Sequence, residues 1–281
     1  FRFAKKNNIK TIYDLTSPYW LFKKKIIEAE LDLQPSWNLS STEIMSQNKC
    51  INKDEEIFLS DQIITASSFT AKSLELYDKN ISSKIKILPY GINCPKKNII
   101  NKRYKNDEFK LIFVGRPTLS KGIQYVIQIL EQIDFPWKLE IAGSLPENPA
   151  EISEKLNIFF KDPRCNFIGQ IPNTSLIEKM SQSHVFIFPS LFEGFGQVLL
   201  EALSCSLPVI TTDNTGGYDI IENGKDGFLT PIRDTGKSIE ILNNLYHDEE
   251  LRRSIAENAF LKASSLTWTR YQNELIKILK D

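Results

Sequence analysis

The stretch that most constrains the fold of this chain is VFIFPSLFEGFGQVLLE, which spans residues 185–201. An apolar run that stops at Pro189 predicts a buried strand. Gly194 and Gly196 predict a short loop, and the apolar pattern after Gly196 predicts a helix packed on the sheet of that strand. A strand, a glycine loop and a helix in this order predict an anion site, because a helix N-terminus offers free N–H groups and the positive end of its dipole.

Two carboxylates accompany this predicted anion site. Glu193 falls in the loop and Glu201 in the following helix, and carboxylates beside an anion are costly unless they bind something else, such as hydroxyl groups. At the helical rise of 1.5 Å per residue the pair would lie about 12 Å apart, whereas glycosidase carboxylates lie about 5–9.5 Å apart. The spacing favours an elongated ligand with hydroxyls at both ends and charge in the middle, and a nucleotide-sugar is such a ligand.

The second part of the chain alternates regularly between predicted strands and helices. This alternation is typical of a parallel, doubly wound α/β sheet. The predicted strands are 110–114, 138–142, 165–168, 185–188, 208–212 and 227–230. The predicted helices that follow these strands lie near 121–133, 150–160, 173–183, 196–205 and 234–246. Two further helices at 249–263 and 267–280 close the chain.

The first part of the chain predicts fewer elements, with strands at 9–15, 62–67 and 84–89 and helices at 18–30, 50–60 and 69–78. Three strands are too few for a complete open sheet, and the chain starts without a methionine, so we expect an N-terminally truncated chain. Residues 93–108 lack periodicity and predict a linker. The expected organisation is therefore an incomplete N-terminal lobe (1–92), the linker (93–108), a second lobe (109–264) and a closing helix (265–281).

Composition excludes several classes of function. Lys plus Arg equal Asp plus Glu at 35 each, so no net field attracts nucleic acid. Four widely spaced cysteines, two histidines and the lack of an Asp-x-Asp motif predict no metal site and favour reduced thiols in a cytoplasmic protein. No apolar run approaches the roughly 20 residues of a membrane span. The Lys23-Lys24-Lys25 cluster, beside aromatic residues, leaves peripheral contact with the inner membrane face as an alternative to a solvated surface.

Ligands of doubly wound sheets bind beyond the carboxyl ends of the strands. Gly115 and Arg116 follow the first strand of the second lobe, and Lys121 falls at the next predicted helix start. The planar fork of Arg116 and the compact charge of Lys121 together favour diphosphate binding, although each alone would be read as a surface charge. Gly143 and Gly169 follow the next two strands and are as consistent with turns as with ligand contact. Asp219, after the fifth strand, is as consistent with a turn residue or a helix cap as with ligand contact.

These residues resemble the motifs of the retaining glycosyltransferases of family 4. That family has the GT-B fold, in which two Rossmann-like lobes with parallel sheets face a cleft. The resemblance covers nearly the whole chain, and its most specific part is the Glu193-x7-Glu201 pair combined with Arg116 and Lys121. Further matches are Phe113-Val114-Gly115-Arg116, Phe167-Ile168-Gly169, Phe188-Pro189-Ser190, Pro208-Val209-Ile210 and Gly227-Phe228-Leu229 in the second lobe, and Ser60-Asp61-Gln62-Ile63-Ile64 and Leu88-Pro89-Tyr90-Gly91 in the first.

The resemblance implies an enzyme that transfers a sugar, with retention, from a UDP-sugar or GDP-sugar to a glycan or lipid-linked acceptor, as in polysaccharide synthesis. It implies that the reaction needs no metal and no evident protein nucleophile. Arg116 and Lys121 would hold the donor diphosphate, and Glu193 would bind the sugar hydroxyls, aided by backbone N–H groups at Gly194–Gly196. Glu201 would bind the ribose, and residues around Gly169–Ile171 would contact the base. The predicted catalytic residues are Glu193, Arg116 and Lys121, and the predicted donor-binding residues are Gly115, Arg116, Lys121, Gly143, Gly169, Ile171, Glu193, Gly194, Phe195, Gly196 and Glu201.

One departure from the family pattern puts a contact in doubt. Where the family commonly has Gly-Gly-x-Pro-Glu, this chain has Gly216-Gly217-Tyr218-Asp219, one residue shorter and with Asp in place of Glu. Three alternatives stay open: a relative of glycogen or sucrose synthases, a catalytically silent nucleotide-sugar-binding module or partner subunit, and a glycoside hydrolase, which the carboxylate spacing disfavours.

Overall fold

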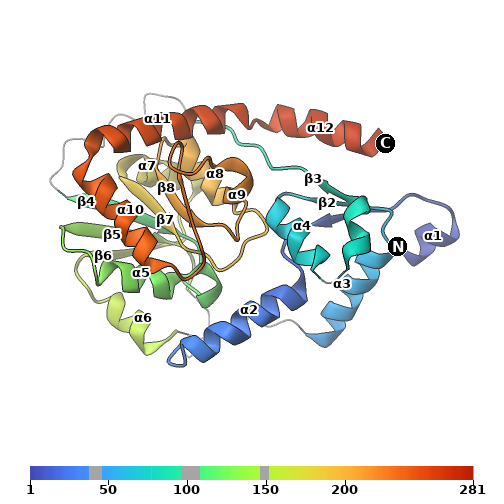
Figure 1. Ribbon diagram of the computed structural model, residues 1–281, viewed down its shortest axis with the longest axis horizontal. Coiled ribbons are helices and arrows are strands. Elements are labelled where there is room, and N and C mark those ends of the chain that lie inside the picture. Colours follow the sequence, from blue (N-terminus) through green and yellow to red (C-terminus); the bar gives the residue numbers. More distant parts are fainter. Residues whose placement is uncertain (38–45, 77, 96–107, 146–151, 281) are drawn as a thin grey trace.

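The computed structural model describes residues 1–37, 46–76, 78–95, 108–145 and 152–280. Two parallel sheets form two units that lie side by side (Figure 1). The described part of the predicted linker is confined to residues 93–95 and 108, because 96–107 lie outside the described residues. The chain crosses between the units twice, once after β3 and once at the start of α12.

The first unit is built on a parallel sheet with the order β1-β2-β3. The strands are β1 (Ile12–Leu15), β2 (Gln62–Thr65) and β3 (Ile85–Ile87), and the helices are α1 (Arg2–Lys6), α2 (Trp20–Leu33), α3 (Gln47–Leu59), α4 (Ser68–Glu75) and the 3-10 helix η2 (Lys79–Lys84). A small core that includes Leu15, Ile57, Ile63 and Leu74 holds these elements together.

The second unit is built on a parallel sheet with the order β6-β5-β4-β7-β8-β9. Its strands are β4 (Phe109–Val114), β5 (Trp137–Ala142), β6 (Cys165–Gly169), β7 (Val185–Phe188), β8 (Val209–Thr212) and β9 (Phe228–Thr230). This order runs outward in both directions from β4 and β7, which is the arrangement of a dinucleotide-binding sheet, and its switch point lies between those two strands. The GT-B architecture expected from the sequence is confirmed.

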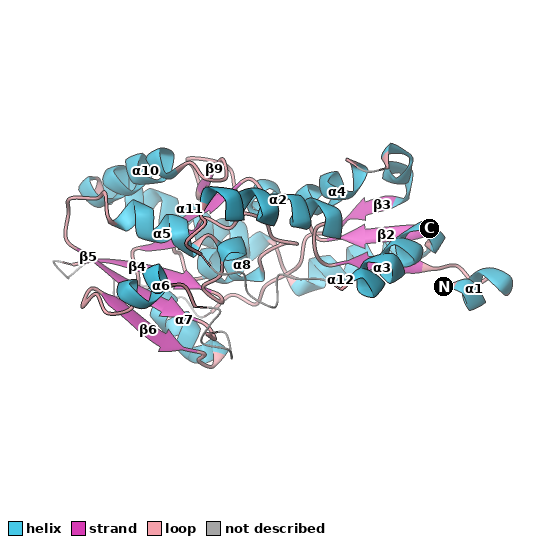
Figure 2. Cartoon of the chain, turned by 90° about the horizontal axis from the view of Figure 1, so that it is seen from below, coloured by secondary structure: helices cyan, strands magenta, loops and turns pink. Residues whose placement is uncertain are grey.

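Helices cover both faces of this second sheet (Figure 2). They are α5 (Ile123–Leu130), α6 (Glu154–Phe159), α7 (Asn173–Gln182), α8 (Gln197–Ser204), α9 (Gly217–Ile220), α10 (Thr235–His247) and α11 (Glu249–Ser265), with the 3-10 helix η5 (Leu119–Lys121) ahead of α5. Burial on both faces explains why the central strands are continuous apolar runs rather than alternating ones. All four residues of β7 are buried.

The two crossings between the units pack against each other. The N–H of Ile92 donates to the carbonyl of Leu266 at 2.8 Å, and the guanidinium of Arg270 donates to the carbonyl of Pro89 at 2.7 Å. From there α12 (Trp268–Lys280) runs over the first unit, while α2 reaches from the first unit toward the second on the opposite side (Figure 1).

Several predicted boundaries were wrong for local reasons. The helix expected at 121–133 is split, because Gly122 adopts a left-handed conformation with φ +74° between η5 and α5. The helix expected at 150–160 begins only at Glu154, where the Ser153 hydroxyl accepts the N–H of Leu156, and residues 150–151 lie outside the described part. The short helices α1 and α9 were not predicted.

Candidate active site

The structure brings two of the predicted loops together at the switch point of the second sheet. Strand β4 pairs with β7 through Leu111 with Val185 and Ile112 with Phe186. Beyond their carboxyl ends, β4 continues into the segment with Gly115 and Arg116, and β7 continues into the loop with Glu193. This crevice is where ligands of doubly wound sheets bind.

The two loops are fastened to each other by backbone contacts. The carbonyl oxygen of Ser120 accepts hydrogen bonds from the Ser190 hydroxyl at 2.9 Å and from the Leu191 N–H at 2.8 Å. A Cβ on Gly122 would lie only 1.9 Å from the carbonyl oxygen of Pro189, so this close approach requires glycine. The segment with Lys121 is therefore held in a fixed position relative to the Glu193 loop.

Lys121 and Glu193 form an ion pair inside this crevice. The Ser190 hydroxyl donates to Oε1 of the same carboxylate at 3.1 Å, and the Glu193 side chain is only 13% exposed. Arg116 is half-buried and donates to the Ser144 hydroxyl, which follows β5, at 3.5 Å. In the described part of the chain no carboxylate pairs with Arg116, so its charge is available to an anionic ligand.

The glycines at this edge have different surroundings. Backbone hydrogen bonds join Gly115 N–H to the Ala142 carbonyl at 2.8 Å and Gly143 N–H to the Gly169 carbonyl at 2.9 Å. A Cβ on Gly143 would lie 2.2 Å from the carbonyl oxygen of Gly115, whereas a Cβ on Gly169 would meet nothing within 4 Å. Close packing of neighbouring strand ends therefore accounts for Gly143, while Gly169 borders open space.

Glu201 faces a different neighbour from Glu193. It lies on α8, and its carboxylate accepts a hydrogen bond from the side-chain amide of Asn173, the first residue of α7, at 3.1 Å. Burial raises the pKa of Glu201, and the Asn173 hydrogen bond partly offsets this rise. Gly169 and Ile171 precede α7, so the predicted ribose-binding residue lies beside the segment predicted to contact the base. Sequence reasoning missed Asn173, whose only signal was its place at a predicted helix start.

The loop after Glu193 buries the ring of Phe195, a residue predicted to contact the donor through its backbone N–H. The Phe195 side chain is 3% exposed and packs edge-to-face against Tyr90 at a centroid distance of 5.2 Å. The ring is thus part of the core, and any contact from Phe195 to a ligand is limited to its backbone. Gly196 adopts φ +81° and leads directly into α8.

The side chain of Asp219 contacts the first unit. It lies in the four-residue helix α9, and its carboxylate accepts hydrogen bonds from the Ser68 hydroxyl and from the Ser68 N–H, the latter at 2.8 Å. Ser68 is the first residue of α4, so Asp219 contributes to the N-terminal end of a helix 151 residues away in the sequence.

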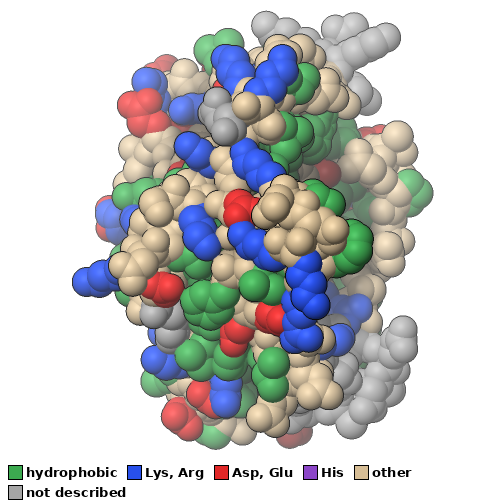
Figure 3. All heavy atoms as spheres, turned by 90° about the vertical axis from the view of Figure 1, so that its right-hand side faces the viewer, with side chains coloured by type: hydrophobic (Ala, Val, Ile, Leu, Met, Phe, Trp, Pro, Cys, Tyr) green, Lys and Arg blue, Asp and Glu red, His purple; other side chains and the backbone are tan. Residues whose placement is uncertain are grey.

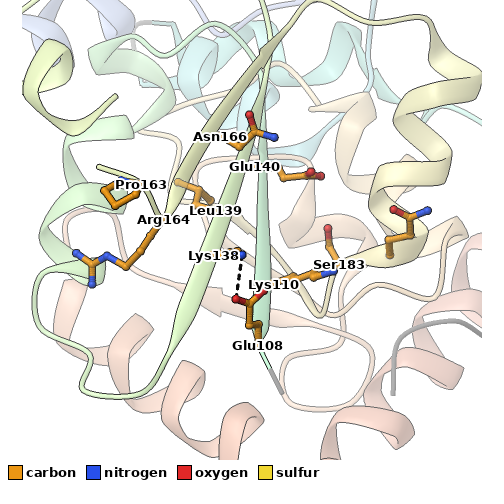
Figure 4. Close-up of a pocket in the computed structure, with 10 residues that line it drawn as sticks. Glu108, Lys110, Lys138, Leu139, Glu140, Pro163, Arg164, Asn166 and Ser183 are labelled. Carbon is orange, nitrogen blue, oxygen red and sulfur yellow. Dashed lines mark ion pairs between the residues drawn. The ribbon is translucent and has the colours of Figure 1, made fainter. Parts of the chain in front are cut away.

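A groove of about 300 Å³ at the opposite end of the second sheet does not share these features. It lies at the amino ends of β4, β5 and β6 (Figure 4), and both of its carboxylates are paired, Glu108 with Lys138 at 2.9 Å and Glu140 with Lys179, outside the groove lining, at 2.7 Å. None of the predicted site residues lines this groove, so the carboxyl edge is the better candidate.

The described residues contain no group of three His, Cys, Asp or Glu side chains that could hold a metal ion. Within that same part of the chain, no helix combines the length and the apolar character needed to cross a membrane.

Together, the GT-B fold and the motif residues at its switch point define a glycosyltransferase-type protein. The chain matches the family described as glycosyl transferases group 1 over residues 95–262, and it belongs to that family. It is 30% identical over 239 residues to the capsular polysaccharide biosynthesis glycosyltransferase CapM of Staphylococcus aureus, which covers 79% of this chain and 60% of CapM. It is 27% identical to an uncharacterized glycosyltransferase of Methanocaldococcus jannaschii, over 75% of this chain and 57% of that protein. The chain therefore spans about three fifths of the length of these relatives.

Solved structures share the fold. The sucrose-phosphate synthase of Thermosynechococcus elongatus superposes with a TM-score of 0.80 at 20% identity, over 99% of this chain and 69% of the synthase. Anabaena HepE, solved in complex with UDP and glucose, superposes with a TM-score of 0.75 at 18% identity, over 99% of this chain and 73% of HepE.

Proposed function

We propose that this protein transfers a sugar from a nucleoside-diphosphate sugar to an acceptor, with retention of configuration at the transferred carbon. The observation that carries the proposal is the ion pair of Lys121 with Glu193 at the β4–β7 switch point, with Arg116 following the end of β4. Two cations suit a diphosphate, and a partly buried carboxylate beside them suits the hydroxyls of the attached sugar.

In this proposal Arg116 and Lys121 bind the diphosphate of the donor. When the bond between the sugar carbon and the diphosphate oxygen breaks, negative charge grows on the leaving group, and fixed cations in a partly dry site stabilise that charge. The pair between Lys121 and Glu193 has to open for this. Lys121 then turns to the phosphate, and Glu193 turns to the sugar. With the leaving group neutralised in this way, no metal ion is required.

The nucleoside would extend from the diphosphate toward α7 and α8. Glu201 and Asn173 would bind the ribose hydroxyls, and the segment with Gly169 and Ile171 would lie against the base. The open space beside Gly169 supports this placement. The donor is proposed to be a UDP-sugar or a GDP-sugar, and the UDP in the HepE structure favours testing uridine first.

The acceptor is proposed to be a glycan or a lipid-linked glycan, in line with the capsular polysaccharide synthesis in the name of CapM. Lysine and arginine side chains lie among apolar groups on the face that Figure 3 shows. Phe3, Ile9 and Phe58 of the first unit are exposed apolar residues. This surface supports peripheral contact with the inner face of an anionic membrane by a cytoplasmic protein.

Calorimetric titration of the chain with UDP, GDP and their common sugar conjugates tests the proposal, first without metal and then with magnesium. We expect metal-independent binding of one nucleotide, weakened 10-fold or more in Arg116→Ala and in Glu201→Ala, because a hydrogen bond to a charged group contributes about 1.5–3 kcal/mol. Lys179→Ala, which breaks an ion pair far from the crevice, is the matched control.

Two outcomes separate the alternatives. Binding of the donor without release or transfer of its sugar to added acceptors would favour the silent binding module. Sugar release from a glycan without any nucleotide would favour the hydrolase and contradict the proposal. A folded chain that binds no nucleotide would overturn the assignment of the donor site.

A further inference from the structure

The carbonyl oxygen of Gly194 is held by two hydroxyl groups of the first unit. It accepts hydrogen bonds from Thr70 at 2.8 Å and from Ser67. Both side chains are fully buried, and they belong to the start of α4, where the Ser67 hydroxyl also accepts the N–H of Thr70 at 3.1 Å. The first unit therefore holds the residue that follows Glu193.

The backbone before Glu193 is fixed from the other side. The Glu193 N–H donates to the carbonyl oxygen of Asn214, in its own unit, at 2.9 Å. Gly194 itself lies so close to the first unit that a Cβ would be 1.8 Å from the carbonyl oxygen of Thr16. Glycine has more backbone freedom than any other residue. At Gly194 this freedom is removed by contacts with residues 124 to 127 positions away in the sequence.

We propose that Ser67 and Thr70 are positioning residues for recognition of the donor sugar. They hold the Gly194 carbonyl, and because the peptide that follows is planar, they also fix the direction of the Phe195 N–H. The Glu193 carboxylate is thereby presented to the sugar in one orientation. This inference rests on the proposed function of Glu193, and it adds that sugar recognition needs the first unit, although the diphosphate and ribose contacts come from the second.

The inference predicts that loss of these hydroxyls weakens recognition of the donor sugar and leaves the affinity for the nucleotide unchanged. Thr70→Val keeps the shape and burial of the side chain but cannot donate a hydrogen bond, and Thr70→Ser restores the donor. The readout is the ratio of the Kd for UDP to the Kd for UDP-glucose, or for the guanosine pair if the chain binds that nucleotide. In Thr70→Val we expect this ratio to fall three- to tenfold, since a buried hydrogen bond contributes about 1 kcal/mol, with the Kd for UDP changed less than twofold.

Ser68→Ala is the matched control for a merely structural role. It removes the hydroxyl that bonds to Asp219 between the same two units without touching Gly194, so the ratio should stay at the wild-type value, as it should in Thr70→Ser. Thermal unfolding of each variant checks that it is folded, and Ser67→Ala supplies a second variant with the same expected fall should valine not be accommodated.

Three results would contradict the inference, and they differ in whether the proposed donor site is contradicted as well. An unchanged ratio in Thr70→Val and Ser67→Ala would overturn it while leaving the donor site in place. An equal fall in Ser68→Ala would also overturn it, because contact between the units in general would then explain the effect. A wild-type chain that binds neither UDP nor GDP, nor their sugars, would overturn the proposed function, and this inference with it.

Discussion

The ammonium of Lys121 and the carboxylate of Glu193 form an ion pair in the crevice at the end of β4 and β7. The two side chains are 31% and 13% exposed, so the pair is partly shielded from water. The groups proposed to bind different parts of one donor therefore neutralise each other in the free protein, and a ligand has to compete with this internal contact.

This pairing predicts opposite effects for the two substitutions. Lys121→Met should raise the Kd for UDP about 10- to 100-fold, because a charge-assisted hydrogen bond to phosphate is lost. Glu193→Gln should leave the Kd for UDP unchanged or lower it, since it frees Lys121, yet it should abolish the preference for the sugar conjugate. Calorimetry with UDP and its sugar conjugate measures both effects.

Lys179→Met serves as the control for the lysine substitution, because Lys179 pairs with Glu140 at 2.7 Å on another part of the sheet. We expect it to bind UDP like the wild type. Weaker UDP binding in Glu193→Gln than in Lys121→Met would contradict the assignment of the sugar to Glu193 and of the phosphate to Lys121.

A second prediction concerns Glu201, whose pKa is raised by burial. The ionised carboxylate is the form that accepts hydrogen bonds from two ribose hydroxyls. Affinity for a nucleotide-sugar should therefore be constant above the folded-state pKa of Glu201 and fall as the pH drops through it.

The stability of the folded protein depends on pH in the opposite direction. The raised pKa of Glu201 means that folding favours its protonated form. The stability that Glu201 contributes is therefore complete below its pKa in the unfolded chain, and it is lost as the pH rises through its pKa in the folded protein.

Titrations of the nucleotide-sugar at a series of pH values measure this dependence. Glu201→Gln should flatten the profile. Asn173→Ala should shift its midpoint to higher pH, because the Asn173 hydrogen bond lowers the pKa of Glu201. If Asn173→Ala moved the midpoint to lower pH, Glu201 would not be the titrating group.

The local parts of the site could be predicted from the sequence. The run from Val185 to Glu201 is a strand, a loop and a helix because each depends on neighbouring residues, and the structure places β7 at Val185–Phe188 and α8 at Gln197–Ser204. The meeting of Lys121 with Glu193 also followed from a general rule, since parallel strands present their carboxyl ends at one edge. The roles of these residues in donor binding stay predictions.

Contacts between the units could not be predicted in the same way. In the sequence Ser67, Thr70 and Asn173 look like any polar residues near a helix start, and only the tertiary fold shows which distant groups they meet. Glu30 is the sharpest case. Nothing in the sequence of its helix sets Glu30 apart from the other charged residues there, yet Glu30 has no exposed surface because α2 packs against the second unit.

Glu30 is the centre of a buried polar cluster that joins the units. One carboxylate oxygen accepts hydrogen bonds from the Gln124 amide at 2.9 Å and from the Tyr125 hydroxyl at 2.6 Å, and the other accepts one from Arg233 at 2.9 Å. Desolvation and the hydrogen bond to Glu30 raise the pKa of Tyr125, so its hydroxyl stays a donor at neutral pH. Gln124 also donates to the carbonyl of Leu119, which connects this cluster to the segment with Lys121.

Glu30→Leu should therefore lower the free energy of unfolding by about 3 kcal/mol, because it leaves Arg233 partly buried without its partner. The double variant Glu30→Leu/Arg233→Met should recover the part of that loss that comes from the unpaired Arg233, since apolar groups can replace a buried ion pair at little cost. The Tyr125 hydroxyl still lacks the acceptor that Glu30 provides, so recovery should be incomplete. Urea denaturation followed by far-UV circular dichroism gives the values. Glu222→Gln, which removes the exposed pair with Lys225, should leave the stability close to that of the wild type. Equal losses in the Glu30 single and double variants would show that the ion pair itself contributes little and that the packing of α2 against the second unit sets the stability.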